Sequence, residues 1–170
     1  GALAVMEGKA LIFKEKGGID AWPIVLTTQD PEEIVMIVKA IAPGWGGINL
    51  EDIAAPACFA VEEKLTKLLN IPVMHDDQHA TAIVVLAGLI NACVVVDKKL
   101  GNVHVVVNGA GAAGIAIVRL LLAAGVTHID LLDSKGIVAK DREGMNVYKD
   151  DVAAIINPSG KQGTLADALH

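Results

Sequence analysis

The chain has 170 residues, of which 53% are hydrophobic and 20% charged, a composition that excludes a disordered chain and indicates a well-filled core. The net charge is −6 and the sequence has no stripe rich in Lys and Arg, which argues against a nucleic-acid partner because phosphate neutralisation needs clustered basic side chains. Aromatic residues make up only 3%, so the core must be built from Val, Ile, Leu and Ala. Such a core suits buried parallel strands that are covered by helices.

The same composition bears on location and redox state. No apolar run reaches, without interruption, the roughly 18 residues needed to span a bilayer. The longest run, residues 80–96, is broken by polar and glycine residues, and we predict a buried helix there. Cys58 and Cys93 lie on separate apolar segments without metal-binding spacing, so we expect reduced, buried thiols. With no secretory signal at the N-terminus, we expect a cytoplasmic protein with no membrane partner. Because the sequence does not begin with Met, we also expect a fragment of a longer protein.

The first half of the chain predicts helices that alternate with short strands. After apolar runs at residues 10–13 and 22–26, Asp30 and Pro31 mark the start of a helix, since Asp can cap and Pro fits the first helical position. We expect that helix to end near Ile41, followed by a strand at residues 46–50, a helix at 56–69, a strand at 71–74 and a long helix at 78–95.

A strand–helix–strand unit follows from residue 103. The sequence predicts a strand at 103–107, a glycine turn at 108–114, a helix at 115–124, a strand at 128–132, and further helices at 149–156 and from 164 to 169. We therefore predict an α/β fold in two domains. We expect the boundary near Asp76, so that residues 1–76 form part of an N-terminal domain and residues 77–170 the first half of a Rossmann-like parallel-sheet domain.

The glycine turn has the G-x-G-x-x-G spacing, between a strand and a helix, that is typical of dinucleotide binding. Gly109 would permit the tight turn, Gly111 would let the backbone approach a pyrophosphate, and Gly114 would let the helix pack closely on the strand. The free N–H groups at the helix start would face the phosphates. The predicted cofactor-binding segment is Gly109, Ala110, Gly111, Ala112, Ala113 and Gly114.

The residues after the second strand bear on the choice between NAD and NADP. Asp133 closes that strand at the position of the acid that meets the ribose, which favours NAD because a carboxylate repels a 2′-phosphate. Ser134 and Lys135 follow directly and could hold that phosphate instead. The sequence leaves the choice open, with a slight lean to NADP.

Two acidic pairs follow predicted strands in the N-terminal half. Glu51 and Asp52 follow one strand, and Asp76 and Asp77 follow the next. Converging carboxylates would repel each other without a divalent cation, and hard oxygen ligands favour Mg²⁺ or Mn²⁺ over zinc. Spacing alone does not distinguish this site from solvated loop carboxylates.

Five strings together resemble the malic enzyme family, in the family's order and spacing and over essentially the whole chain. They are V-M-E-G-K-A at 5–10, G-G-I-N-L-E-D-I at 46–53, H-D-D-Q-H-A-T-A at 75–82, N-G-A-G-A-A-G-I-A at 108–116 and L-D-S-K-G at 132–136. The resemblance implies that residues 1–76 belong to an N-terminal metal- and substrate-binding domain. It implies that Glu51, Asp52 and Asp77 are the ligands of the divalent metal. It also implies that Lys9 is the general base, with a pKa lowered by nearby positive charge and burial, and that the acid Asp76 assists it.

The activity implied by the resemblance is oxidative decarboxylation of (S)-malate to pyruvate and CO₂, with reduction of NAD or NADP and dependence on Mg²⁺ or Mn²⁺. A homodimer or homotetramer is implied in the same way. The family's tyrosine acid and substrate-binding arginine would lie upstream of Gly1, and its substrate-contacting asparagines downstream, so we expect the isolated chain to be inactive and poorly soluble. Two alternatives stay open. One is a malolactic-type enzyme that releases lactate, and the other is a dinucleotide-binding remnant without catalysis.

Overall fold

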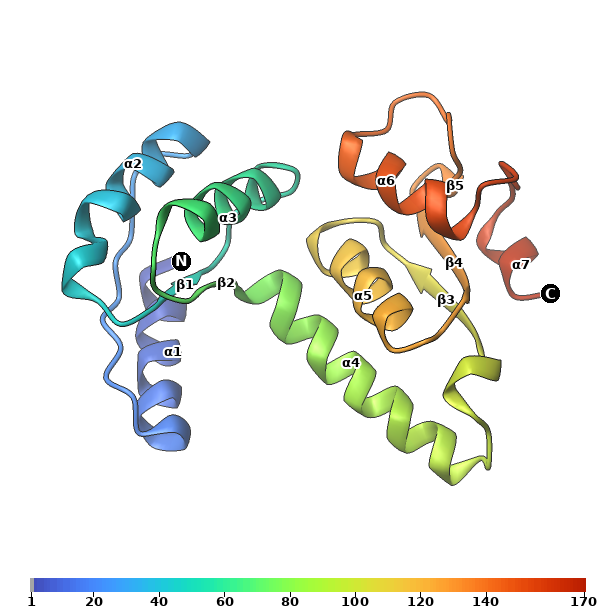
Figure 1. The fold of residues 1–170 in the computed structure, drawn as a ribbon, viewed down its shortest axis with the longest axis horizontal. Coiled ribbons are helices and arrows are strands. Elements are labelled where there is room, and N and C mark those ends of the chain that lie inside the picture. The colour runs from blue at the N-terminus through green and yellow to red at the C-terminus, as the bar shows by residue number, and fades with distance from the viewer. Residues whose placement is uncertain (1) are drawn as a thin grey trace.

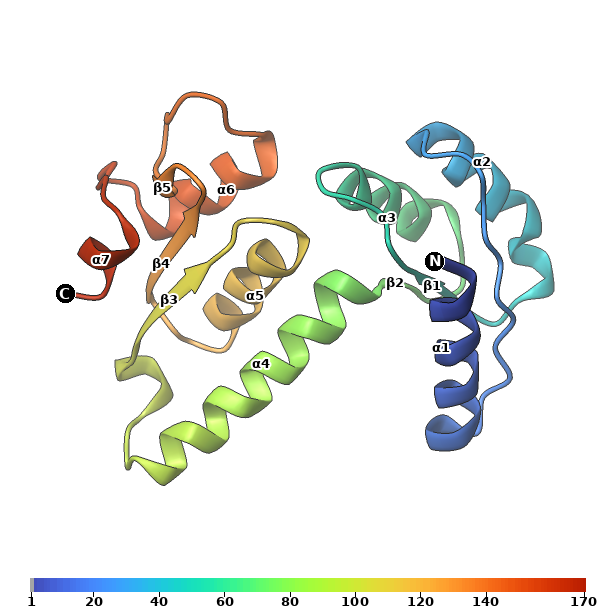
Figure 2. The ribbon, with the colours of Figure 1, turned by 180° about the vertical axis from the view of Figure 1, so that it is seen from behind.

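The computed structural model describes residues 2–170, and Figures 1 and 2 show two lobes that one long helix joins. The N-terminal lobe holds a small parallel sheet, in which Ile48 pairs with Val73 and Leu50 with His75. The elements of this lobe are α1 (Ala2–Gly17), α2 (Pro31–Ile41), the 3₁₀ turn η1 (Ala42–Gly44), β1 (Ile48–Leu50), α3 (Ala57–Leu68) and β2 (Val73–His75).

Helix α2 begins and ends at the residues that the sequence indicates. The Asp30 carboxylate accepts hydrogen bonds from the backbone N–H groups of Glu32 and Glu33, and Pro31 occupies the first helical position. Its apolar face packs with α3 and β1 in one cluster. The buried members of that cluster are Ile34, Val35, Val38, Leu50, Val61 and Leu65.

Helix α1 was only partly anticipated. The sequence indicates a short apolar run at residues 10–13, whereas the structure has a helix from Ala2 to Gly17. None of its residues is buried, and Leu11 and Ile12 are exposed. Its apolar residues therefore follow no helical period, and the sequence pattern could not identify it.

The C-terminal lobe is a three-stranded sheet with helices packed against it. The strand order is β3-β4-β5, with β3 and β4 parallel and β4 and β5 antiparallel. The elements are α4 (Asp76–Val95), η2 (Leu100–Asn102), β3 (His104–Asn108), α5 (Ala112–Ala123), β4 (His128–Asp133), β5 (Gly136–Ile137), α6 (Val147–Ile156) and α7 (Leu165–Ala168). The expected strand–helix–strand unit is confirmed, and the small strand β5 is an addition.

One apolar cluster joins α5, the covered face of the sheet and α3. Val118 and Leu131 are fully buried within it, and Cys58 and Phe59 of α3 belong to the same cluster. The ring of Phe59 lies 4.4 Å, centroid to centroid, from that of Tyr148 on α6. The two lobes are therefore held together by apolar contact as well as by the chain.

Both cysteines are buried free thiols, as predicted from their apolar surroundings. Burial raises the pKa of the Cys58 thiol to about 11, because a thiolate in an apolar environment loses its hydration. Cys58 is therefore a packing residue of the core and is held as the neutral thiol.

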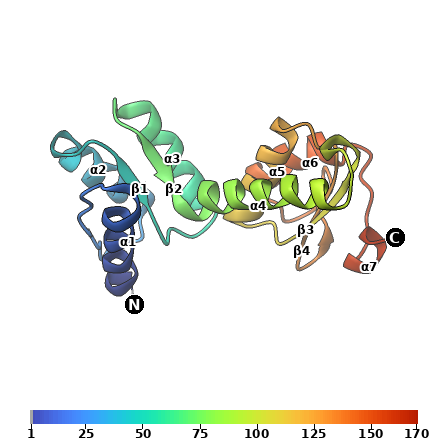
Figure 3. The ribbon, with the colours of Figure 1, turned by 90° about the horizontal axis from the view of Figure 1, so that it is seen from below.

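Helix α4 corrects one expectation. The sequence predicts a buried helix at residues 80–96, and a helix is present, but only a narrow stripe of it is buried. It packs along α5, whereas Val84, Val94 and Val95 on its other faces are exposed. Figure 3 shows α4 running from one lobe along the edge of the other. Its length and apolarity would suffice to cross a membrane, a property that the core helices of globular proteins share.

Candidate functional site

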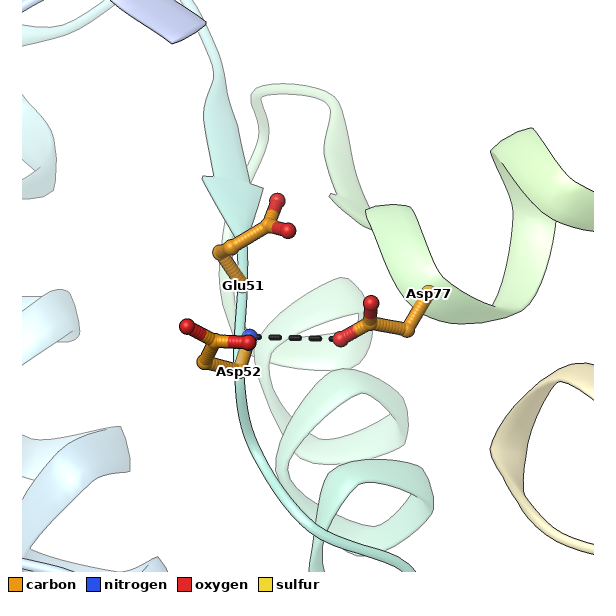
Figure 4. A group of neighbouring side chains, drawn as sticks. All are labelled: Glu51, Asp52 and Asp77. Atoms are coloured by element: carbon orange, nitrogen blue, oxygen red, sulfur yellow. Dashed lines mark hydrogen bonds between the residues drawn. The ribbon is translucent and has the colours of Figure 1, made fainter. Parts of the chain in front are cut away.

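The three acids that were predicted to bind a metal come together in the structure. Glu51 and Asp52 directly follow β1, and Asp77 lies in the first turn of α4 after β2. Because β1 and β2 are parallel neighbours, their carboxyl ends meet at the same edge of the small sheet. One carboxylate oxygen from each of Glu51, Asp52 and Asp77 lies within 4.8 Å of the other two. Figure 4 shows the three side chains gathered between the end of β1 and the start of α4.

The backbone at Asp52 contributes to this arrangement. Asp52 has φ of 56°, in the left-handed region that few residues other than glycine adopt. Its backbone N–H donates to the Asp77 carboxylate at 3.2 Å, the contact drawn as a dashed line in Figure 4. The turn thus ties the end of β1 to the start of α4, and Asp is one of the few residues that tolerate this conformation.

The donor set fits a hard divalent cation. Three carboxylates at this spacing carry three negative charges, and hard oxygen ligands are those of Mg²⁺ and Mn²⁺. The buried Oδ1 atom of Asn49, next to the cluster in sequence, has no hydrogen-bond partner within residues 2–170. His75 is fully buried with both ring nitrogens unpartnered in the same range, and its Nε2 lies 3.8 Å from Asp77 Oδ2. Polar groups without partners beside the carboxylates are consistent with a site that an ion completes.

Lys9 lies at the same cluster although it is distant in sequence. Its Nζ donates to Asp76 and lies 2.6 Å from Glu51 Oε2. Partial burial favours the neutral amine, but the hydrogen bonds to Asp76 and Glu51 and their negative charges outweigh it, so the pKa of Lys9 is raised above its ordinary value. The expectation of a lowered pKa is wrong for this arrangement, because the nearest charged groups are carboxylates and not cations.

Three of the charged residues at this site line one wall of a large cleft. Lys9, Glu51 and Asp52 border a cavity of about 990 Å³ between α1, the extended segment 19–29 and β1. The rest of its lining is mostly apolar, with Phe13 and Trp22 among the side chains. A concave apolar site with a few convergent charged groups is typical of small-molecule binding.

The glycine turn joins β3 to α5 with the geometry that its spacing predicts. Gly109 has φ of 131°, and a Cβ atom at Gly114 would lie 1.7 Å from the Gly109 carbonyl oxygen. Gly111 precedes α5 without a side-chain cap, and no atom lies within 4 Å of the place where its Cβ would be. The first turn of α5 includes Ala112 and Ala113, and no side chain caps its N–H groups because the N-cap residue is Gly111. A helix start that binds an anion needs such uncapped N–H groups.

Asp133 is not the free carboxylate that the sequence suggests. Its Oδ2 accepts from Lys149 Nζ at 2.7 Å and from Arg142 Nη2, and its Oδ1 accepts from the Lys135 N–H at 2.9 Å. Despite burial, these partners hold the pKa of Asp133 well below its usual range. Ser134 and Lys135 are exposed beside it. The two cations offset the charge that would repel a 2′-phosphate.

Sequence reasoning did not single out three of the residues that make these contacts. Arg142 and Lys149 are the cations that pair with Asp133. The side chain of Glu62 in the N-terminal lobe is only 13% exposed, and it accepts hydrogen bonds from the His75 N–H and the Gln78 side-chain amide. Each contact joins elements that are distant in the chain, and no local sequence signal could have identified them.

One lobe has a glycine turn between a parallel strand and a helix, and the other has strands that end in carboxylates. This combination is typical of a two-domain, dinucleotide-dependent enzyme. The sequence matches the malic enzyme N-terminal domain over residues 1–66 and the malic enzyme NAD binding domain over residues 78–167. The chain belongs to the malic enzyme family.

Curated relatives and solved structures agree with this assignment. The chain is 55% identical to the NAD-dependent malic enzyme of Geobacillus stearothermophilus, covering 99% of this chain and 35% of that protein. It is 54% identical to a bifunctional malic/malolactic enzyme of Bacillus subtilis, covering 99% of this chain and 41% of that protein. The crystal structure of the NAD-dependent malic enzyme from Thermotoga maritima superimposes with a TM-score of 0.94 at 48% identity, covering 99% of this chain and 45% of that one. The chain thus spans between 35% and 45% of the length of these relatives.

Proposed function

We propose that this chain is part of an enzyme that converts (S)-malate to pyruvate and CO₂ with reduction of NAD or NADP and with a divalent metal. The observation that carries the proposal is the meeting of Glu51, Asp52 and Asp77 at one sheet edge with Lys9 against them. The relatives' names, which include NAD-dependent and NADP-dependent malic enzymes, support the reaction and both cofactors.

The proposed roles follow from position. Glu51, Asp52 and Asp77 would hold Mg²⁺ or Mn²⁺, which when bound would supply Lewis-acid polarisation of the substrate oxygens. Lys9 reaches the cavity wall beside Glu51 and, as the neutral amine, would take the proton of the substrate hydroxyl. A divalent cation held by Glu51 would favour that neutral form, because it would offset the carboxylate charge that raises the pKa of Lys9. Asp76 accepts a hydrogen bond from Lys9 and would orient its amine.

The dinucleotide would lie on the other lobe. Its pyrophosphate would meet the turn from Gly109 to Gly114, where the space beside Gly111 is open. The adenosine ribose would lie near Asp133, Ser134 and Lys135. With the charge of Asp133 offset by Arg142 and Lys149, a 2′-phosphate is not excluded there, which keeps the slight lean to NADP.

The remaining proposals concern organisation. We propose a division into domains at residues 1–76 and 77–170, which agrees with the two lobes of Figure 1, and assembly as a homodimer or homotetramer. A cytoplasmic location stays a prediction.

The test uses a full-length enzyme that contains this segment. Pyruvate and reduced cofactor are measured with malate and Mn²⁺, with NAD and NADP offered separately. Asp77→Ala and Lys9→Ala should each lower turnover by at least about 100-fold, whereas the exposed controls Asp151→Ala and Lys14→Ala should not change it. Full turnover in Asp77→Ala, or turnover that a chelator does not affect, would refute the proposed site.

One relative favours a second candidate. The Bacillus subtilis protein is named a bifunctional malic/malolactic enzyme, so the same scaffold could also release lactate. Lactate formed from malate without net cofactor reduction would identify this activity in the same assay. Dinucleotide binding without any turnover would instead favour the alternative of a dinucleotide-binding remnant without catalysis.

A further inference from the structure

Glu62 of α3 lies against the junction between β2 and α4. Its side chain is 13% exposed, whereas its neighbour Glu63 on the same helix is exposed. Val61, directly before it, is fully buried in the cluster formed by α2, α3 and β1. The carboxylate of Glu62 is thus brought to the junction by a well-packed helix.

Both oxygens of the Glu62 carboxylate are used, and all donors lie at the start of α4. Oε1 accepts from the backbone N–H of His75 at 2.9 Å, and the imidazole Nε2 of His79 lies 2.8 Å from the same oxygen. Oε2 accepts from Gln78 Nε2 at 3.1 Å. Asp76 and Asp77 lie between these donors in the chain. One carboxylate therefore holds residues on both sides of the two acids.

The start of α4 has few other anchors. His75 provides no side-chain cap, and the buried residues of α4 are Gln78, Ala82 and Cys93. Apart from the contacts that Asp52 and Lys9 make with the two acids themselves, the first turn is positioned by the short pairing of β2 with β1 and by the bonds to Glu62. A negative charge close to the first N–H groups of a helix also stabilises that end of the helix.

We propose that Glu62 is a positioning residue, which fixes Asp76 against Lys9 and Asp77 against Glu51 and Asp52. The part that concerns metal rests on the proposed function. Without Glu62, the His75 N–H and the Gln78 amide lose their acceptor, and the first turn of α4 is free to rotate or fray. Loss of an outer hydrogen-bond partner of a metal site commonly weakens metal binding by about 10–100-fold.

The experiment compares Glu62→Ala, Glu62→Gln and the matched exposed control Glu63→Ala in the full-length enzyme. Hydrogen exchange of the amides of residues 75–80 is measured without metal, and Mn²⁺ binding is measured by calorimetric titration. Glu62→Ala should speed exchange by at least about tenfold and weaken Mn²⁺ binding by about 10–100-fold. Glu62→Gln should stay within about threefold of the parent, because its amide oxygen still accepts from His75 and the Gln78 amide can turn to match it.

Unchanged amide exchange and Mn²⁺ affinity in Glu62→Ala would overturn the proposal. So would equal changes of both quantities in Glu62→Gln, because the negative charge of Glu62 and not its hydrogen bonds would then be responsible. If Glu62→Ala does not fold, Gln78→Ala removes the side-chain donor to Oε2 and leaves Glu62 in place, and its exchange and Mn²⁺ affinity must still change by about threefold. Asp77→Ala distinguishes the two proposals. If it binds Mn²⁺ normally while Glu62→Ala speeds exchange, the metal site is wrong and the positioning role stands.

Discussion

Replacement of Gly114 by Ala tests the packing of the glycine turn at residues 108–114. The added Cβ would lie 1.7 Å from the Gly109 carbonyl oxygen and 2.9 Å from its carbonyl carbon, both backbone atoms that cannot rotate away. Helix α5 or the turn must therefore shift by more than an ångström. Overpacking of this kind costs about 1–3 kcal/mol, so in the full-length enzyme the free energy of unfolding should fall by that amount, and the melting temperature with it.

Two other glycines provide matched controls. Gly111→Ala meets no atom within 4 Å, so the protein should keep its stability but lose dinucleotide affinity if a pyrophosphate approaches there. Gly88→Ala, on an exposed face of α4, should raise stability by about 0.5–1 kcal/mol because Ala is the better helix former. Circular dichroism on heating and titration with NAD and NADP measure both effects. A stable Gly114→Ala variant with normal dinucleotide affinity would refute the reasoning.

Three further substitutions test separate contacts. Asp133→Asn should destabilise the protein at pH 7, because it leaves two partly buried cations unpaired. The pKa of Asp133 in the folded protein lies below its unfolded value of about 3.9, so the difference in unfolding free energy from the parent should shrink as the pH falls below about 4. Urea unfolding measures this difference, and a difference that stays constant with pH would contradict the prediction. Phe59→Ala should lower the free energy of unfolding by about 3–5 kcal/mol in the same assay, because the residue is 2% exposed and its ring packs on Tyr148. Tyr148→Phe keeps that ring contact and is the control. Asp30→Ala should cost about 1 kcal/mol by removing the cap of α2, and a neutral result would show that the cap is not needed.

Local signals in the sequence predicted most of the fold. The bounds of α2 follow from a capping Asp and a Pro at the first position, and both act within one turn of the chain. The strand, glycine turn and helix from residue 103 follow from apolar runs and glycine spacing, and the clash at Gly114 gives the physical reason for that spacing. The carboxylates of Glu51 and Asp77 could be placed together because parallel neighbouring strands end at one edge.

Contacts between distant side chains could not be predicted in this way. Asp133 was correctly placed at a strand end, but its partner Lys149 comes from another element, and this partner changes what the carboxylate can do. Lys9 and Asp76 are 67 positions apart, and only the resemblance to a family connected them. The sign of the Lys9 pKa shift depends on which charges surround the amine in three dimensions, so the expectation from sequence was wrong.

Helix α4 couples the two halves of the proposed site. Its first turn carries Asp76 and Asp77, and its length packs along α5, whose N-terminus forms the dinucleotide turn. The distance from the acids to that turn is therefore set by the packing of α4 on α5 and by the hold of Glu62 on the start of α4. A displacement of α5 by Gly114→Ala should consequently weaken Mn²⁺ binding as well as dinucleotide binding. The same substitution with full Mn²⁺ affinity would show that contacts within the N-terminal lobe hold the first turn of α4 without help from α5.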